Sequence, residues 1–332
     1  MEPLRVLHVI NKEKVTSVPR QWCDAGDSLN DHKLLAVNNV SMVIPEVVRS
    51  DILHLHQIKS AVLVLMLAKF YKKKTVYTMH GSFTFLSLSN RLLLFFVFLL
   101  ADRIVFVNEH LMHELPSVFS KLFKAKSEVV LNGVSYDKLD QMGEAEKNVK
   151  YEGKNFIFHP ARHVPEKNIS NLILAFNSVK EKCDCSLFLA GDGPLTKDLK
   201  ELCKELNLGE RVIFLGFIPR QQVMYYLRIC KGFIMPSISE GLNVAFLEAL
   251  ALNKKCIVSR IPSFQKAFAQ WNIEPAELDT YFVDPRSIES IGDAICSVCC
   301  TEEVSIGSGR QRHFLSLENM LSRYNDIYRA IA

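Results

Sequence analysis

Two glutamates, Glu240 and Glu248, interrupt a segment that otherwise has the composition of a protein core. Ile234 to Pro236 before them predict the end of a buried strand, and Val244 to Leu252 predict a short apolar helix. A carboxylate is costly in such surroundings unless it meets a partner. We therefore expect each glutamate to be bound, either by the protein or by a ligand beyond the carboxyl end of the strand, where α/β proteins bind their ligands.

The spacing of the two glutamates limits what they do together. Eight residues climb roughly 12 Å along a helix, whereas a retaining glycosidase holds its two carboxylates about 5 Å apart. Instead of acting on one atom, they could hold two ends of an elongated ligand whose charged middle lies against the amides of Gly241, Leu242 and Asn243. A nucleotide sugar has that layout. The structural alternative is that Glu240 caps the helix and Glu248 is a buried, satisfied acid.

A segment upstream carries two cations. Phe156 to Arg162 predicts a strand that runs into a loop, and Arg162 and Lys167 flank that loop. Arginine binds phosphate through a planar fork and lysine as a point charge, so the pair suits a diphosphate. The alternative is that both are solvated surface cations, as most lysines and arginines are.

Two further apolar segments, Leu187 to Pro194 and Val212 to Pro219, predict strands that end near Gly191 and Gly216. Glycine at the end of a strand lets a ligand approach the backbone closely. Most such glycines only form a turn, so these two indicate a ligand site only in combination with the other motifs.

Together these motifs resemble those of the retaining glycosyltransferases of family 4, the glycosyl transferases group 1, which have the GT-B fold. The resemblance covers most of the second half of the chain and rests on Ala161-Arg162, Glu166-Lys167-Asn168, Ala190 to Pro194, Leu215-Gly216-Phe217, Pro236-Ser237, Ser239-Glu240-Gly241 and Glu248 to Ala251. The first half is similar more loosely, at Tyr77 to Gly81 and Val129 to Val134. The implied fold class is α/β, with two Rossmann-like, doubly wound domains facing across a cleft.

The resemblance implies a role for each matched side chain. Arg162 and Lys167 would bind the donor diphosphate and neutralise the leaving group, which is where charge develops in the reaction. Glu248 would accept hydrogen bonds from the ribose hydroxyls, and Glu240 would hold the donor sugar. His80 would face the sugar from the other domain. No residue is expected to act as a nucleophile.

The resemblance also implies donor contacts made by the backbone and by an aromatic ring. The amides of Gly241, Leu242 and Asn243 would contact sugar and phosphate, and Gly216 and Phe217 would lie near the base. Gly191 would be part of the same substrate site. No Asp-x-Asp motif occurs in the chain, so we expect neither a metal nor another cofactor.

The chain departs from the family pattern after its first strand. Many relatives carry a Gly-Gly pair there, whereas Asn11 to Arg20 contains no glycine. Either Ser17 and its neighbours replace that contact, or the loop serves another acceptor. Arg20 is an anion ligand or a solvated cation.

Short apolar strands recur along the chain with helical segments between them, which predicts parallel, doubly wound sheets. In the first half the expected strands are Leu4–Ile10, Leu34–Val37, Ile52–His54, Lys74–Met79, Arg103–Val107 and Glu128–Leu131. We expect an acceptor-binding domain over residues 1–150 and a nucleotide-sugar domain over 151–312, with a polar linker from Asp137 to Asn155. A helix over 313–332 would cross back to the first domain, as the resemblance implies.

Composition agrees with a cytoplasmic enzyme. The chain has 332 residues, of which 48% are hydrophobic, and its net charge of +4 is too small to indicate nucleic-acid binding. Its nine cysteines, an odd number, suit reduced core residues. Cys296, Cys299 and Cys300 have a metal-like gap without a second ligand pair of zinc spacing.

The apolar segment from Leu92 to Ala101 bears on the membrane. It is shorter than the roughly 20 residues that span a bilayer. We favour a helix buried against the first sheet. The alternative is a helix whose exposed face enters the bilayer interface on the cytoplasmic side, with Lys69 and Lys72 to Lys74 near anionic headgroups.

The sequence thus predicts a retaining, metal-independent glycosyltransferase that uses a nucleotide-diphosphate sugar, with a UDP-hexose or UDP-N-acetylhexosamine favoured. From the resemblance, the acceptor is a glycan or lipid-linked saccharide of bacterial surface polysaccharide synthesis, such as O-antigen or lipopolysaccharide. The alternatives are a GT-B nucleotide-sugar epimerase or phosphorylase, and a non-catalytic sugar-nucleotide-binding protein.

Overall fold

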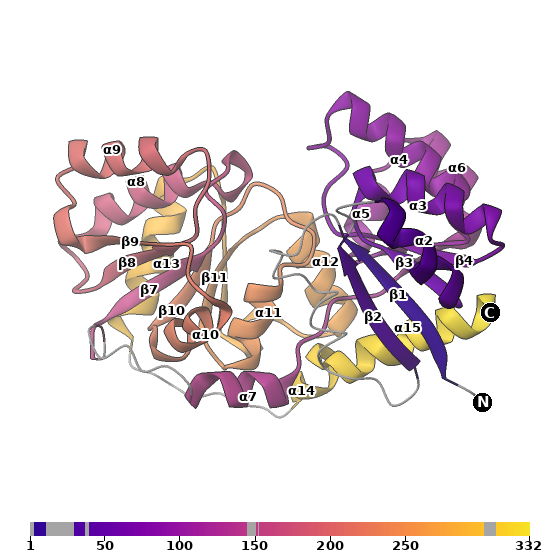
Figure 1. The fold of residues 1–332 in the computed structure, drawn as a ribbon. Helices are drawn as coiled ribbons and strands as arrows, with labels where there is room; N and C mark the ends of the chain where they lie inside the picture. The colour runs from indigo at the N-terminus through magenta and orange to yellow at the C-terminus, as the bar shows by residue number, and fades with distance from the viewer. Residues whose placement is uncertain (1–2, 11–29, 37–39, 145–150, 152, 302–309) are drawn as a thin grey trace. The chain divides into compact units, whose positions relative to one another are not determined.

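The computed structural model describes residues 3–10, 30–36, 40–144, 151, 153–301 and 310–332. The chain forms two compact units, Met1–Ser135 with Ser316–Ala332, and Tyr136–Leu315 (Figure 1). Each unit contains a six-stranded sheet in which all strand pairs are parallel. The expected α/β class with two doubly wound, Rossmann-like domains is confirmed.

The first sheet has the strand order β2-β1-β3-β4-β5-β6. Its strands are β1 (Leu4–Ile10), β2 (Asn30–Ala36), β3 (Ile52–Leu55), β4 (Lys74–Met79), β5 (Arg103–Phe106) and β6 (Ser127–Val129). The described helices of this unit are α2 (Val40–Arg49), α3 (Ile58–Phe70), α4 (Leu88–Leu100), α5 (Glu109–His113), α6 (Ser117–Phe123) and α15 (Leu317–Ile331).

The second sheet has the strand order β12-β11-β10-β7-β8-β9. Its strands are β7 (Phe156–Pro160), β8 (Ser186–Ala190), β9 (Val212–Gly216), β10 (Gly232–Met235), β11 (Lys255–Ser259) and β12 (Thr280–Val283). The described helices here are α7 (Tyr136–Glu144), α8 (Ile169–Val179), α9 (Thr196–Glu205), α10 (Arg220–Ile229), α11 (Val244–Ala251), α12 (Pro262–Trp271), α13 (Ile288–Cys300) and α14 (Arg310–Leu315).

Strand β2 and helix α7 depart from the sequence-based expectation, and β3, β5 and β6 differ from it by one or two residues at their ends. Strand β2 begins at Asn30, four residues before the expected Leu34, because its polar first residues pair in register with β1 from Leu4↔Asn30 onward. The expected linker after Asp137 begins as helix α7. That helix is stabilised by the burial of Leu139 and by the Nη2 of Arg228 on α10, which donates to the Leu139 carbonyl at 2.5 Å.

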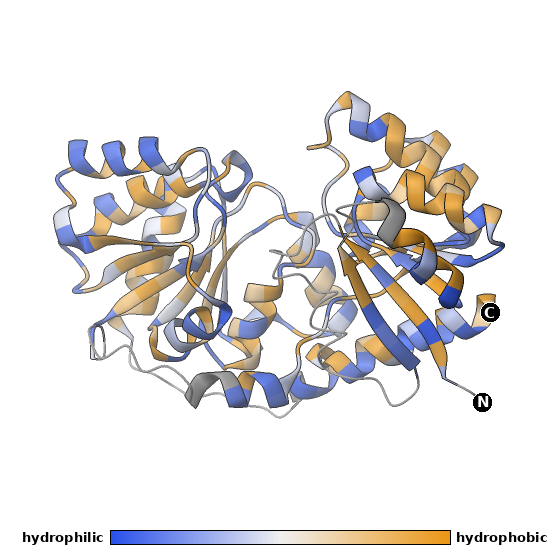
Figure 2. Ribbon diagram, in the orientation of Figure 1, coloured by the Kyte–Doolittle hydropathy of each residue, from blue (hydrophilic) through white to orange (hydrophobic). Residues whose placement is uncertain are grey.

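Helix α4 has two apolar faces with different surroundings. Leu94, Val97 and Phe98 are buried in the first unit, whereas Leu92 and Phe96 are more than half exposed. One side of α4 is therefore buried in the first unit, as the favoured expectation has it, while the other side is exposed, and its contact with a bilayer stays a prediction. Figure 2 shows apolar residues along α3, α4 and α6. Among the described residues, no helix is long and apolar enough to cross a membrane.

The final helix, α15, belongs to the first unit. The chain enters it beside Gly133, where a Cβ would lie 2.4 Å from the carbonyl oxygen of Ser316. The buried rings of Tyr324 and Tyr328 then lie against the sheet. The hydroxyl of Tyr328 is 2.7 Å from Nδ1 of His54, and that of Tyr324 is 3.1 Å from Oγ1 of Thr78. Polar contacts therefore join α15 to β3 and β4.

We expect Tyr328→Phe to lower the free energy of unfolding by about 1 kcal/mol, because it removes a buried hydrogen bond without changing the ring. Tyr324→Phe is the matched control. This control should lose less of the free energy of unfolding, since Thr78 Oγ1 keeps its 2.7 Å bond to Nε2 of His54. Urea unfolding measures both, and equal losses would contradict this ranking.

Candidate functional site

The loop between β10 and α11 carries the first of the two glutamates. Asn243 is the N-cap of α11, and its Oδ1 accepts hydrogen bonds from the amides of Ala245 and Phe246 at 2.9 and 3.3 Å. The alternative in which Glu240 caps the helix is therefore wrong. The side chain of Asn243 thus binds two of the first amides of the helix, those of Ala245 and Phe246. The amides of Gly241, Leu242 and Asn243 precede them in the loop after β10.

Glu240 is buried and held by two partners from the second unit. Its Oε1 lies 2.5 Å from Nζ of Lys167 and accepts a 2.8 Å hydrogen bond from the hydroxyl of Ser237. The backbone joins the same two loops, since the amide of Ile238 donates to the carbonyl of Glu166 at 2.9 Å. The structure thus brings the Lys167 loop and the Glu240 loop together.

Glu248 is 2% exposed on α11 and pairs with Arg220 from the first turn of α10, through Nη2 and Oε1. Burial raises the pKa of Glu248, and the positive charge of Arg220 opposes that rise. The expectation that each buried carboxylate meets a partner is confirmed. Sequence reasoning missed Arg220, although it is the first cation after the Leu215-Gly216-Phe217 motif.

Arg162 differs from the other cations of this unit. Its side chain is 77% exposed, and its nearest acid is Glu166 at 3.9 Å, a solvent-exposed pair that contributes little. Lys167, by contrast, is mostly buried against Glu240. Of the two expected phosphate ligands, Arg162 therefore points its guanidinium into solvent and Lys167 already neutralises a carboxylate.

Asn168 fastens the loop that carries Lys167, a role that sequence reasoning did not assign. Its backbone is left-handed, with φ of 58°. Its Nδ2 donates to the carbonyls of Pro236 at 2.9 Å and Pro285 at 2.7 Å. A side-chain amide in this position fixes the loop after β7 against the loops after β10 and β12.

Gly191, directly after β8, serves close backbone packing. A Cβ on Gly191, where φ is +129°, would lie 2.0 Å from the carbonyl oxygen of Ala161. The Gly191 amide donates to the carbonyl of Gly216 at 2.7 Å. Gly216 also has positive φ, and it is followed by Phe217, which is 74% exposed. The loops after β7, β8 and β9 therefore touch through their backbones, with Phe217 in solvent.

The remaining predicted site residues lie elsewhere. His80 follows β4 in the first unit, where its Nε2 is 3.0 Å from Nδ1 of His56, and burial lowers its pKa to about 4. Ser17 and Arg20 lie outside the described residues, so their predicted roles stay predictions.

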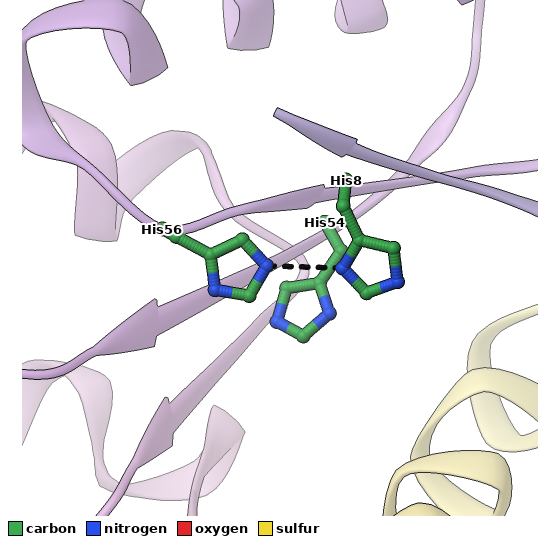
Figure 3. Close-up of side chains that lie close together, drawn as sticks. All are labelled: His8, His54 and His56. Carbon is green, nitrogen blue, oxygen red and sulfur yellow. Dashed lines mark hydrogen bonds between the residues drawn. The ribbon is translucent and has the colours of Figure 1, made fainter. Parts of the chain in front are cut away.

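One group of described residues has the ligand types of a metal site. Ring nitrogens of His8, His54 and His56 all lie within 4.8 Å of one another (Figure 3). No carboxylate or thiolate belongs to this group, and both nitrogens of His54 are bonded to the hydroxyls of Tyr328 and Thr78. This arrangement satisfies imidazoles with hydrogen bonds rather than directing three lone pairs at one point.

The second unit also brings cysteines together that the sequence keeps far apart. The Sγ atoms of Cys183 and Cys296 are 3.0 Å apart, and those of Cys185 and Cys299 are 2.7 Å apart. All four are free thiols, and they form two separate contacts rather than a three-ligand group.

We expect Arg220→Met to lower the free energy of unfolding at pH 7 by about 3 kcal/mol, because it leaves the Glu248 charge buried without its cation. Burial already holds the pKa of Glu248 above its value in the unfolded chain. The folded variant therefore binds a proton more readily than the unfolded chain, so its deficit should grow as pH rises from about 5 to 8.

Denaturant unfolding at several pH values measures this effect. The double variant Arg220→Met/Glu248→Leu removes both charges and should recover most of the loss. A deficit independent of pH, or no recovery, would contradict an electrostatic origin.

Two family models match this chain. Residues 140–304 match the one described as Glycosyl transferases group 1, and residues 11–138 match Glycosyltransferase Family 4. Each unit therefore contains one of the two matches.

Curated relatives match over part of the chain. The chain is 31% identical over 137 residues to the alpha-monoglucosyldiacylglycerol synthase of Streptococcus pneumoniae, covering 39% of this chain and 31% of that protein. It is 31% identical over 167 residues to the N-acetylgalactosamine-N,N'-diacetylbacillosaminyl-diphospho-undecaprenol 4-alpha-N-acetylgalactosaminyltransferase of Campylobacter jejuni, covering 50% and 44%. The chain therefore spans less than half the length of these two relatives.

A solved structure matches the whole fold. Anabaena HepE in complex with UDP and glucose gives a TM-score of 0.79 at 14% identity, covering 98% of this chain and 100% of that one. At this identity the likeness concerns the fold. With a family model matched in each unit and this fold, the chain belongs to the family 4 glycosyltransferases, the glycosyl transferases group 1, of GT-B fold.

Proposed function

We propose that this protein is a retaining glycosyltransferase that moves a hexose or N-acetylhexosamine from a UDP-sugar to a glycan or lipid-linked acceptor. The reaction would proceed without a metal, and its place would be bacterial surface polysaccharide synthesis. Family membership supports the activity, and the name of the Campylobacter relative supports a lipid-linked saccharide as acceptor. The UDP complex of HepE supports UDP as the donor nucleotide.

The observation that carries the proposal is how the two glutamates are bonded. Among the described residues, every hydrogen bond to the side-chain carboxylates of Glu240 and Glu248 uses Oε1, from Lys167 and Ser237 in one case and from Arg220 in the other. The cations keep the carboxylates in place, while each Oε2 remains an acceptor. Glu248 would take the ribose hydroxyls and Glu240 those of the donor sugar.

The diphosphate would lie against the exposed guanidinium of Arg162 and the amides of Gly241 to Asn243. Breaking the bond between sugar and phosphate builds negative charge on the departing oxygen. Preorganised donors and cations stabilise that charge more than the ground state, which lowers the barrier. Lys167 would add its charge at the same place, with Phe217 and Gly216 beside the base. The new bond would form on the face from which the diphosphate leaves.

The first test compares UDP with uridine in thermal unfolding. A ligand at a hundredfold excess over its dissociation constant stabilises the folded protein by about 2.7 kcal/mol. Arg162→Ala should weaken UDP binding roughly tenfold or more and leave uridine binding unchanged, because it removes a charged hydrogen bond to phosphate alone. Glu248→Gln should weaken both ligands, since it alters the ribose contact.

Lys197→Ala on α9 and Glu205→Gln on the same helix are exposed controls that should bind both ligands as the wild type does. No stabilisation by UDP, GDP, ADP or CMP would reject the donor site. Equal losses of UDP and uridine binding in Arg162→Ala would reject its phosphate role.

We propose further that the first unit docks on a membrane surface through α3, α4 and α6. Large apolar side chains are exposed on all three helices, among them Phe70, Leu92 and Leu122. Lys72 and Lys74 follow Phe70 and are exposed as well. Apolar side chains flanked by lysines suit the interface of an anionic bilayer, and a lipid-linked acceptor would be found there.

The triple variant Phe70→Ser/Leu88→Ser/Leu92→Ser should bind vesicles of phosphatidylglycerol and phosphatidylcholine at least tenfold more weakly than the wild type, because each serine removes apolar surface that would enter the interface. All three side chains are more than 60% exposed, so folding should be unaffected. Vesicle sedimentation measures binding. The control Val48→Ser/Ile288→Ser alters exposed apolar residues outside these helices. Equal binding by all three proteins would reject the docking face.

A further inference from the structure

The second unit holds four of its thiols as two pairs. Sγ of Cys183 lies 3.0 Å from Sγ of Cys296, and Sγ of Cys185 lies 2.7 Å from Sγ of Cys299. The partners are 113 and 114 positions apart in the sequence. Each pair joins the segment directly before β8 to helix α13. We call these four residues the thiol pairs.

Local structure places the two pairs in register. Cys183 and Cys185 are buried on either side of the exposed Asp184, so their side chains point to the same side of the segment. Cys296 and Cys299 are three positions apart on α13, a spacing that puts two side chains on one face of a helix. Because these two faces meet, each thiol of one segment has its own partner on the other.

The backbone around the pairs is held by other contacts. Arg211 donates from Nη2 to the carbonyls of Cys183 and Cys185 at 2.8 and 3.0 Å, and from Nε to that of Cys185 at 3.1 Å. On the opposite side, a Cβ on Gly292 of α13 would lie 3.0 Å from Cγ1 of Val179 on α8, so α13 packs closely there. The packing of the unit therefore brings the sulfurs together before any bond joins them.

A disulfide bond needs little movement from this arrangement. Bonded sulfurs are about 2.05 Å apart, so each pair closes by a shift of about 1 Å or less. Cys183 and Cys185 are buried, whereas Cys296 and Cys299 are partly exposed. Each pair therefore has one member on the side that is open to a small solute.

The members of each pair differ in acidity. The thiol of Cys299 donates to Sγ of Cys185, which lowers the pKa of Cys185, and the charge of Arg211 lowers it further against the effect of burial. The same hydrogen bond raises the pKa of Cys299. In the other pair, burial raises the pKa of Cys183. Since the thiolate is the nucleophile in cysteine oxidation, Cys185 is the attacking sulfur of its pair and Cys299 the resolving one.

We propose that the thiol pairs are a peroxide-sensitive modification site, at which two disulfide bonds lock α13 to the segment before β8. In each pair one thiol attacks a peroxide oxygen, which gives a sulfenic acid and one water. The second thiol attacks that sulfur, the sulfur–sulfur bond forms, and the oxygen leaves as a second water. Each bond thus oxidises two thiols and reduces one peroxide. A dithiol reverses the step by exchange and becomes a disulfide itself.

The lock acts on the stability of the second unit rather than on its candidate donor site. The thiol pairs lie at the amino end of β8, whereas Arg162, Lys167 and Glu240 lie in loops that follow the carboxyl ends of β7 and β10. A bond between residues so far apart in the sequence restricts the unfolded chain strongly. The oxidised protein should therefore resist unfolding while the donor loops keep their contacts. This inference does not depend on the proposed transferase function.

Thiol counting tests the pairing. The reduced, denatured protein has nine thiols. After treatment with hydrogen peroxide, the denatured wild type should take up iodoacetamide at four fewer sites by mass spectrometry, and dithiothreitol should restore all four. Cys300→Ser, which removes an exposed thiol outside the pairs, should lose four sites as well. A wild type that keeps all its thiols, or loses only two, would overturn the proposal.

Paired and crossed variants provide the matched control. Cys183→Ala/Cys296→Ala and Cys185→Ala/Cys299→Ala each leave one contact intact and should lose two sites. The crossed variant Cys183→Ala/Cys299→Ala removes as many thiols but leaves one member of each pair, so it should lose none. Losses of two sites at equal rates in all three variants would overturn the pairing. Stoichiometric binding of Zn²⁺ that protects all four thiols of the reduced wild type would overturn it in favour of a metal site.

Thermal unfolding tests the lock. The oxidised wild type should melt at least about 5 °C above the reduced protein, because each bond closes a long loop. Cys203→Ala alters a buried thiol of the same core outside the pairs and should show the same rise on oxidation. The crossed variant should show no rise. Equal melting temperatures of the oxidised and reduced wild type would overturn the lock even if four thiols are lost.

Discussion

The arrangement of the second unit depends on neutralising two carboxylates that its own packing buries. Helix α11 is apolar enough to be covered by the unit, yet it carries Glu248 and follows directly after Glu240. Neither helix nor loop supplies a cation, so each charge must be met from another βα segment, Arg220 from α10 and Lys167 from the loop after β7. Buried ion pairs of this kind add little net stability, but they fix which loops stand next to one another.

The same constraint explains the backbone of the surrounding loops. Because Lys167 must reach Glu240, its loop is tied down by Asn168 and by the Ile238 amide. The neighbouring loop after β8 then passes so close to Ala161 that only glycine fits at position 191. Gly191, which a ligand-based argument assigns to substrate, is thus already required by the protein's own packing, and the two explanations are compatible.

The residues of a single segment are sufficient to predict a strand when its apolar pattern lies within that segment. Leu4–Ile10 and Lys74–Met79 are strands with the expected bounds, since their apolar runs are bounded by polar residues. The predicted start of β2 at Leu34 is too late, because the polar first half of this strand is held by pairing with β1. Arg220 and the contacts of His8 with His32 and His56 could not be found in this way, because a partner for Glu248 or a ring beside His8 is decided by strand order and register between distant segments.

The two units hold their buried polar side chains by different chemistry. The second unit uses fixed charges, whose protonation does not change near neutral pH for arginine and lysine, and such groups suit an anion that must be bound and released. The first unit uses neutral imidazoles bonded to one another, so no net charge is placed in a medium of low dielectric constant. A row of neutral rings holds no anion, and each ring offers one N–H and one lone pair to its neighbours. Neither arrangement therefore leaves a buried charge without a partner: the carboxylates of the second unit meet cations, and the buried imidazoles of the first meet one another.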